Sequence, residues 1–302
     1  MLAPDQAGPV PLWPGSLHTV GDQKVFLRSA GGDGEPVLCV HGLEGSSANW
    51  TDLMALLLPE FASSAVDLPG FGLSPPSEAG YSITAQAEAV AAVIEHVCGG
   101  PVHLIGNSLG GAVSVRVAAR RPDLVRTLTL ISPVLPDRRP DPFLFRFPLL
   151  CVPGLGGFLM RQTVRIPPEL RVRATAAAIC YDASGLHPAR LGDEAAEMAR
   201  RDGLAYASRA TLGTIRSLVA ERFSGQLWRD ASLVRARTLA IFGSHDRFVD
   251  PRLAGRAARA FRDSRVIVLP ETGHVAQLEH PAKVAAEIRE CARRARGLRL
   301  RW

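Results

Sequence analysis

Short apolar runs alternate along the chain with longer segments whose apolar residues recur at helical spacing. Several runs are continuously apolar and end at glycine, which is typical of parallel strands buried on both faces. The predicted strands cover residues 24–29, 36–42, 62–70, 101–108, 125–132, 238–246 and 265–273. The predicted helices cover residues 49–58, 83–98, 109–120, 251–261 and 281–295. This alternation predicts an α/β fold with a mostly parallel central sheet and helices on both faces.

One long segment interrupts the alternation. Residues 137–230 contain no clear strand and begin with an apolar stretch that is broken by Arg, Pro and Gly. Helix-like pieces follow over residues 169–180, 191–201 and 203–221. We therefore expect residues 137–230 to form a helical insertion in a core made of residues 1–136 and 231–302. The interrupted apolar opening of the insertion could line a pocket or its mouth.

Composition narrows the class of protein. The chain has 302 residues, of which 47% are hydrophobic, so a sizeable buried core is expected. No stretch of about 18 uninterrupted apolar residues occurs, and the first residues lack the pattern of a secretory signal, so we expect no membrane span and no export. The five cysteines are scattered and never form a CxxC pair. This favours buried thiols in a reducing cytoplasm over disulfides or a zinc site.

The charge is positive and comes almost entirely from arginine. The formal net charge is +6, and residues 289–301 carry six arginines and one glutamate. We interpret this tail as a solvated helix end with an Arg-rich extension, with weak attraction to acidic surfaces or anionic lipid as the alternative. No aromatic interleaving or nucleic-acid motif accompanies the arginines, so no nucleic-acid partner is expected.

The segment "LIGNSLGGA" (residues 104–112) places Ser108 between glycines in the spacing G-x-S-x-G, after a predicted strand and before a predicted helix. In so sharp a turn, side chains at positions 106 and 110 would collide with the neighbouring strand and helix, and the serine hydroxyl is lifted above the sheet edge. A serine hydroxyl is a poor nucleophile near neutral pH and needs an adjacent base. The motif alone is weak evidence, because a turn serine that merely caps the next helix also fits it.

An acid and a base occur at matching places in the pattern. Asp246 ends the strand "TLAIFGSHD", and His274 follows the strand "RVIVLPETG". Both lie at carboxyl ends of predicted strands, the edge where open α/β sheets bind ligands, and the chain order is Ser, Asp, His. Asp250 and His280 compete for these roles, but each is next to a proline at a predicted helix start. His245 adjoins Asp246 and is interpreted as a loop residue.

Oxyanion donors are expected from two backbone positions. The loop "VHGLEGS" (residues 40–46) directly follows an early predicted strand, and its glycines allow backbone to approach a ligand. The N–H of Leu43 could pair with the N–H of Leu109 as an oxyanion hole.

These motifs make the chain resemble serine-nucleophile enzymes of the α/β-hydrolase fold with a helical cap. The resemblance rests on "HGLEGSSANW", "DLPGFGLS", "GNSLGGA", "GSHDRFVD" and "GHVAQLEHP", which span residues 41–281. It implies Ser108 as nucleophile, Asp246 as acid, His274 as base, and the N–H groups of Leu43 and Leu109 as oxyanion donors. It also implies that the insertion is the cap and that no metal or cofactor takes part.

Within that family the motifs are most similar to carbon–carbon bond hydrolases of aromatic meta-cleavage pathways and to related carboxylesterases. The C–C hydrolases usually carry a Gly-Pro-Gly-rich oxyanion loop, where this chain has "HGLEGSS". Ser108 argues against epoxide hydrolases and haloalkane dehalogenases, which use an aspartate nucleophile. Of the remaining residues, His41 is interpreted as structural and Asp67 as bonded within its own loop. Trp50 and the phenylalanines of segment 143–147 are interpreted as packing residues more than substrate contacts.

The sequence thus predicts a cytoplasmic serine hydrolase that cleaves an ester-type bond of a small to medium hydrophobic substrate through an acyl-enzyme. Three alternatives stay open. They are C–C hydrolysis of a meta-cleavage-type diketone, a non-catalytic small-molecule receptor of the same fold, and an accessory acyl-transfer or cyclisation step. The sequence leaves the natural substrate open and does not decide between monomer and homodimer.

Overall fold

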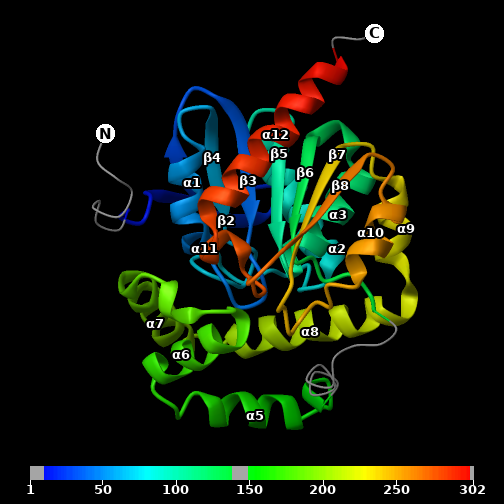
Figure 1. Cartoon of the computed structure of the whole chain (residues 1–302). Coiled ribbons are helices and arrows are strands. Elements are labelled where there is room, and N and C mark those ends of the chain that lie inside the picture. Colours follow the sequence, from blue (N-terminus) through cyan, green and yellow to red (C-terminus); the bar gives the residue numbers. More distant parts are fainter. Residues whose placement is uncertain (1–9, 138–148, 300–302) are drawn as a thin grey trace.

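The computed structural model describes residues 10–137 and 149–299. The phenylalanines of segment 143–147 lie outside the described residues. The centre is one eight-stranded sheet with the order β1-β2-β4-β3-β5-β6-β7-β8 (Figure 1). The strands are β1 (Gly15–Val20), β2 (Gln23–Gly31), β3 (Glu35–Val40), β4 (Phe61–Val66), β5 (Val102–Asn107), β6 (Val125–Ile131), β7 (Arg237–Gly243) and β8 (Ser264–Leu269). Strand β2 runs antiparallel to both of its neighbours, and all other pairs are parallel.

Helices cover both faces of the sheet. The core helices are α1 (Thr51–Leu57), α2 (Ile83–His96), α3 (Leu109–Arg120), α9 (Gln226–Leu233), α10 (Leu253–Ala260), α11 (Ala276–Glu279) and α12 (Pro281–Arg299). Short 3-10 turns are η2 (Ser47–Trp50), η3 (Pro122–Leu124) and η5 (Ala183–Gly185). Helices α1, α11 and α12 lie on one face, and α2, α3, α9 and α10 lie on the other (Figure 1). Within the described ranges, no helix is both long enough and apolar enough to span a bilayer.

The continuous apolar runs exist because each strand is buried on both faces. In β3, Leu38 and Val40 pack among the residues under α2 and α3, while Val37 and Cys39 pack under α1 and α12. Burying a valine or leucine side chain contributes about 1.5–3 kcal/mol relative to leaving it in water. Both faces of the sheet therefore have to be covered, as the apolar runs predicted.

The structure confirms the predicted α/β fold and each of the seven predicted strands. It adds one strand, β1, which pairs with β2 as a hairpin through the turn at Gly21 and Asp22. The sequence indicates a turn at Gly21 and Asp22 with half of a hairpin after it, but "GSLHTV" does not mark the first strand, because that strand lies at the sheet edge and buries little. Only Val20 is buried, and the side chain of Leu17 is 55% exposed.

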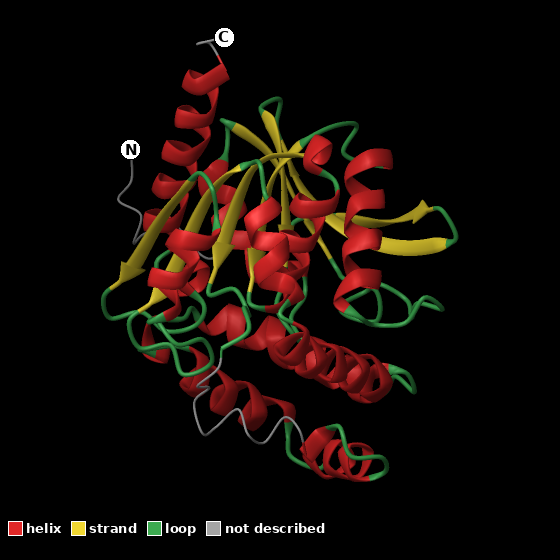
Figure 2. Ribbon diagram, turned by 90° about the vertical axis from the view of Figure 1, so that its right-hand side faces the viewer, coloured by secondary structure: helices red, strands yellow, loops and turns green. Residues whose placement is uncertain are grey.

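The insertion follows β6 and precedes β7. It contains α5 (Leu155–Thr163), α6 (Pro168–Ile179), α7 (Pro188–Asp202) and α8 (Ala207–Ser224), which lie beyond the carboxyl ends of the parallel strands (Figures 1 and 2). Helix α9, although it comes before β7, packs on α3 and α10 with the core helices.

Candidate active site

Ser108 occupies a strained turn between β5 and α3. Its backbone has φ +56° and ψ −117°, a conformation that costs a non-glycine residue of the order of 1–3 kcal/mol. The turn is held because the Ser108 N–H donates to the carbonyl oxygen of Ile131 at 3.0 Å. A Cβ at Gly106 would lie 2.3 Å from the Gly110 oxygen, and one at Gly110 would lie 2.1 Å from the Val40 oxygen. Both glycines are thus required by the close approach of α3 to β3 and β5.

Asp246 and His274 meet beyond β7 and β8. The Nδ1 of His274 lies 2.8 Å from Oδ2 and 3.0 Å from Oδ1 of Asp246, and both side chains are largely buried. Oδ1 of Asp246 also accepts the N–H groups of Phe248 and Val249 at 2.8 and 3.0 Å. Burial opposes ionisation of Asp246, but the imidazole and the two N–H groups outweigh it and hold the pKa of this carboxyl below its usual value.

The competing residues have other partners. The carboxylate of Asp250 accepts the N–H of Arg252 at 2.8 Å and pairs with its guanidinium at the start of α10. His280 begins the turn into α12, and its Nε2 lies 3.3 Å from the carbonyl oxygen of Glu271. The Nδ1 of His245 bonds with the Ser244 hydroxyl at 2.8 Å. The side chains of Asp250, His280 and His245 thus make no hydrogen bond to Asp246 or His274 among the described residues.

Asn107 joins the serine turn to the histidine loop. Its side-chain amide donates to the carbonyl oxygen of His274 at 3.0 Å and to that of Ile131 at 3.1 Å. The N–H of His274 in turn donates to the carbonyl oxygen of Ile179, the last residue of α6, at 2.6 Å. The loop that carries the imidazole is therefore tied to both the core and the insertion. Asn107 was not predicted as a site residue, because its only signal in the sequence is its place directly before Ser108.

The loop after β3 lies against the serine. A Cβ at Gly42 would lie 3.2 Å from the Ser108 Cβ. Leu109 is the first residue of α3, so its N–H has no acceptor within the helix, and the N–H of Leu43 donates to no described residue. Leu43 and Leu109 both line the same cavity as Ser108.

His41 and Asp67 hold this loop in place. His41 is 1% exposed; its Nδ1 donates to the Gly42 carbonyl oxygen at 2.7 Å, and its Nε2 accepts the Leu68 N–H at 2.9 Å. This pattern fits a neutral imidazole, and burial lowers the pKa of His41. Asp67 accepts the N–H of Ser47 at 2.5 Å and one N–H of its own loop at 2.7 Å. These contacts agree with the structural roles expected for both residues.

A cavity of about 1040 Å³ lies between the sheet edge and the insertion. Ser108 and His274 both line it. Most of its wall is apolar, and the insertion supplies Leu150, Met160, Val172, Ile179, Leu191 and Ile215. Trp50 also lines it, although its side chain is fully buried in the core.

One part of the wall, where η2 and α1 face α7, is polar. Asn49 donates a hydrogen bond to Glu194 Oε1. Arg190 pairs with Asp52 at 2.6 Å and with Asp193 at 3.0 Å, and all five side chains line the cavity. This polar wall was not predicted, because the sequence around Glu194 looks the same as that of any amphipathic helix with solvated acidic residues.

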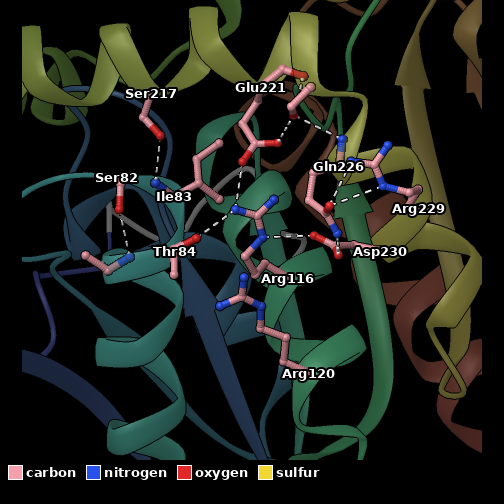
Figure 3. A network of polar contacts seen from close by, with 12 residues as sticks. Ser82, Ile83, Thr84, Arg116, Arg120, Ser217, Glu221, Gln226, Arg229 and Asp230 are labelled. Atoms are coloured by element: carbon pink, nitrogen blue, oxygen red, sulfur yellow. Dashed lines mark hydrogen bonds and ion pairs between the residues drawn. The ribbon is translucent and has the colours of Figure 1, made fainter.

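A buried ionic network connects the insertion to the helix that starts after Ser108. The Arg116 guanidinium on α3 binds Asp230 of α9 at 2.8 Å, Glu221 of α8 at 2.7 Å and the Thr84 hydroxyl of α2 at 2.9 Å (Figure 3). The side chain of Arg116 is only 3% exposed. Because Glu221 also lines the cavity, this network fixes one end of α8 relative to the core.

Among the described residues, no group of three or more His, Cys, Asp or Glu side chains is arranged to hold a metal ion.

A family model for the alpha/beta hydrolase fold matches residues 35–281. The pimeloyl-[acyl-carrier protein] methyl ester esterase of Neisseria meningitidis serogroup C is 29% identical over 262 residues, which cover 84% of this chain and 92% of that protein.

A second relative is longer than this chain. The dihydrolipoyllysine-residue acetyltransferase component of the acetoin cleaving system of Cupriavidus necator is 28% identical over 265 residues. The match covers 85% of this chain but 63% of that protein, less than two thirds of its length. Among solved structures, the 2-hydroxy-6-oxo-6-phenylhexa-2,4-dienoate hydrolase of Rhodococcus sp. strain RHA1 superimposes with a TM-score of 0.76 at 21% identity. It covers 93% of this chain and 98% of that one, a likeness of fold.

Proposed function

The chain belongs to the alpha/beta hydrolase fold family, and from that premise we propose that it is a serine hydrolase that cleaves an ester bond of a small to medium hydrophobic substrate. Ser108 would be the nucleophile, His274 the base and Asp246 the orienting acid. The N–H groups of Leu43 and Leu109 would form the oxyanion hole. The esterase relative from Neisseria meningitidis supports the reaction class.

The observation that carries this proposal is that Ser108 and the bonded pair of His274 and Asp246 line or border one cavity. The imidazole is held by its Nδ1, at 2.8 Å from the carboxylate, which leaves Nε2 as the atom for proton transfer. A serine in a strained turn beside a carboxylate-held imidazole is the arrangement that nucleophilic acyl transfer requires.

In the proposed first step, Ser108 Oγ attacks the ester carbonyl carbon and His274 Nε2 accepts the hydroxyl proton. The oxyanion that forms accepts hydrogen bonds from the N–H groups of Leu43 and Leu109, each worth about a hundredfold or more in rate. The C–O bond then breaks, the alcohol leaves with the proton from His274, and an acyl-serine remains. Asp246 stabilises the imidazolium that exists between these transfers.

The second step repeats the first with water. His274 takes a proton from water, the hydroxide attacks the acyl carbon, and the carboxylic acid leaves as Ser108 regains its proton. Each proton transfer uses groups of the chain and water alone. The apolar cavity of about 1040 Å³ favours a hydrophobic acyl or alcohol part.

We further propose that helices α5 to α8 act as a cap that encloses this substrate, with the core resuming at α9. The packing of α9 on α3 supports that division of the insertion. We also propose a cytoplasmic location, which is supported by the thiol state of Cys39, Cys98, Cys180 and Cys291.

The test is a panel of chromogenic esters of varied acyl length together with labelling by a fluorescent organophosphonate. Ser108→Ala should lose labelling and at least about a thousandfold in kcat. The matched control is Ser184→Ala, which removes an exposed serine hydroxyl in η5 and should keep both. Labelling that persists in Ser108→Ala, or a wild-type protein that neither labels nor hydrolyses any ester, would overturn the proposal.

A further inference from the structure

The polar part of the cavity wall has a fixed geometry. Asn49 Oδ1 accepts the N–H of Ser46 at 2.9 Å, which fixes the orientation of the amide and points its Nδ2 toward Glu194 Oε1. Ser46 is the last residue of the loop, residues 40–46, that contains the proposed oxyanion donor Leu43. The second carboxylate oxygen of Glu194 accepts no hydrogen bond from any residue that the structure describes. One oxygen of this carboxylate is thus anchored to the core, and the other is available to the cavity.

Glu194 differs from its acidic neighbours in the same wall. Asp52 and Asp193 share Arg190, and Glu221 of α8 pairs with Arg116 of α3. No cation lies within ion-pair distance of Glu194 among residues 10–137 and 149–299.

Three acidic groups act on the Glu194 carboxyl, while Arg190, one turn back on α7, is paired with Asp52 and Asp193. The three acidic groups are Glu197 and Asp193 on α7 and Asp67 in the core, and each of them opposes ionisation of the Glu194 carboxyl. Burial is the largest cause, and together with these charges it outweighs the hydrogen bond from Asn49 and raises the pKa of Glu194 to about 7. Arg222, the other arginine of the cavity wall, is near the carboxyl end of α8, on the opposite side of the molecule from α7 (Figure 1).

We propose that Glu194, held by Asn49, is a subsite that binds the protonated amine of a substrate, so that the enzyme prefers amine-bearing hydrophobic esters over neutral and carboxylate-bearing ones. The turnover part of this inference rests on the proposed esterase function, but the binding part does not. An ammonium group placed here forms a charge-assisted hydrogen bond with the free carboxylate oxygen and supplies the missing countercharge. A carboxylate placed here instead meets a cluster of like charges.

Binding tests the subsite without any turnover. Hexylammonium, hexanol and hexanoate are titrated calorimetrically into Ser108→Ala at about pH 8. We expect hexylammonium to bind about tenfold more tightly than hexanol and hexanoate to bind most weakly. This ranking needs no further substitution, so equal affinity for all three compounds, or tighter hexanoate, overturns the proposal directly.

Substitution assigns the preference to one residue. Glu194→Gln, added to Ser108→Ala, should remove the tenfold advantage of hexylammonium and leave hexanol unchanged. The matched control is Glu197→Gln, one turn further along α7, which removes the same charge from a residue that pairs with Arg200 and does not line the cavity. Loss of the advantage in both variants, or in neither, overturns the assignment to Glu194.

Turnover separates this inference from the proposed function. The p-nitrophenyl esters of 6-aminohexanoate, hexanoate and adipate have six-carbon acyl chains. These chains end in an ammonium, a methyl and a carboxylate at about the same distance from the ester carbonyl. Glu194→Gln should raise KM about tenfold for the amino ester alone and leave kcat unchanged. If no ester is cleaved by the wild type, the proposed function fails while the calorimetric ranking still decides the subsite. If the hexanoate ester is cleaved but the amino ester gains nothing, the subsite fails alone.

Discussion

The side-chain amide of Asn107 donates a hydrogen bond to the carbonyl oxygen of His274 at 3.0 Å. This bond links residues that are 167 positions apart, and it connects the turn of the proposed nucleophile to the loop of the proposed base. Since Asn107 directly precedes Ser108, a shift of either loop moves both reacting groups. The relative position of serine and imidazole is thus set by a residue that need not touch the substrate.

The first prediction concerns this positioning residue. Asn107→Asp keeps the shape of the side chain but replaces two N–H donors by an oxygen that repels the carbonyl oxygens of His274 and Ile131. We expect kcat for esters to fall about tenfold or more, with little change in KM, because a misplacement near 1 Å is costly in rate. The kcat measured in steady-state assays and the rate of organophosphonate labelling should fall by similar factors.

A matched control is Gln86→Glu, which changes a fully buried amide that donates to the Pro69 carbonyl oxygen at 3.2 Å, outside the cavity wall. Both variants should lower the melting temperature, but only Asn107→Asp should lower kcat beyond the loss of folded protein. Equal losses of kcat in Asn107→Asp and Gln86→Glu would show that Asn107 has only a structural role.

The second prediction distinguishes Asp246 from Asp250. Asp246→Asn leaves the side chain in place but removes the charge that stabilises the imidazolium and fixes the His274 tautomer. We expect kcat to fall by about 10³ to 10⁴ with the fold retained. Asp250→Asn removes a carboxylate that pairs with Arg252 at the start of α10, and its kcat should stay within about threefold of the wild type. The reverse order of effects in ester kinetics would assign the acid to Asp250.

Much of the fold followed from local patterns, and the reason is visible in β3, where Val37 to Val40 alternate between two buried faces. Signals of this kind are local, so they also located Asp246 and His274 at strand ends. For the edge strand β1 only the hairpin turn at Gly21 and Asp22 was indicated, because the strand itself buries almost nothing. The expected boundary at residue 230 falls inside α9, because the packing of α9 on α3 is a tertiary contact with no local marker.

The polar part of the cavity wall likewise depends on a tertiary contact that local sequence does not reveal. Glu194 meets Asn49 across 145 residues of sequence, and the contact exists only because the insertion folds back over the core. Helix α7 is amphipathic, and its pattern of charges is equally compatible with full solvation of Glu194. The sequence therefore predicted Ser108, Asp246 and His274 as site residues but gave no sign of the proposed amine subsite.

The third prediction is a pH dependence of selectivity. Burial, and after it the charges of Glu197 and Asp193 on α7 and of Asp67 in the core, raise the pKa of Glu194 to about 7, although the hydrogen bond from Asn49 lowers it. Arg190, one turn back on α7, is paired with Asp52 and Asp193. Below that pH the carboxyl is neutral in the free enzyme, while the amine of the amino ester stays protonated. The ratio of kcat/KM for the amino ester to that for the hexanoate ester should therefore fall as pH decreases through about 7.

Taking this ratio cancels the pH dependence that comes from the proposed catalytic base, because the same base acts on both esters. In Glu194→Gln the ratio should be low and independent of pH between about 5.5 and 8.5. A ratio in the wild type that stays constant across this range would contradict a titrating carboxyl in the subsite.

The fourth prediction concerns stability. The raised pKa of Glu194, from an ordinary value of 4.5 to about 7, means that the folded state binds more protons than the unfolded state between these values. The contribution of this carboxyl is therefore fully present below about pH 4.5 and is lost as pH rises through about 7. Glutamine lacks this titration, so Glu194→Gln should gain stability relative to the wild type as pH rises from about 5 to about 8. Urea unfolding at both pH values measures the difference, and a constant difference would contradict the prediction.

The fifth prediction concerns the network around Arg116, which joins α3 to Glu221 and Asp230 (Figure 3). Arg116→Met fills a similar volume but leaves two largely buried carboxylates without their shared cation, so we expect unfolding free energy to fall by about 3 kcal/mol or more. Arg120→Met is the matched control, because Arg120 is one turn along α3, half-exposed, and 3.9 Å from Glu88. Its loss should stay below about 1 kcal/mol.

The same pair of variants tests whether the network also holds the proposed cap, helices α5 to α8. Glu221 is on α8 and lines the cavity, so releasing it should loosen the cavity wall at that end and raise KM for long-chain esters more than for short ones. Adding Glu221→Gln and Asp230→Asn to Arg116→Met removes both stranded charges and should recover part of the lost stability. Failure to recover any stability would show that packing of the arginine stem, and not charge pairing, is what Arg116 contributes. A KM that is unchanged at every chain length would confine the network to a role in folding.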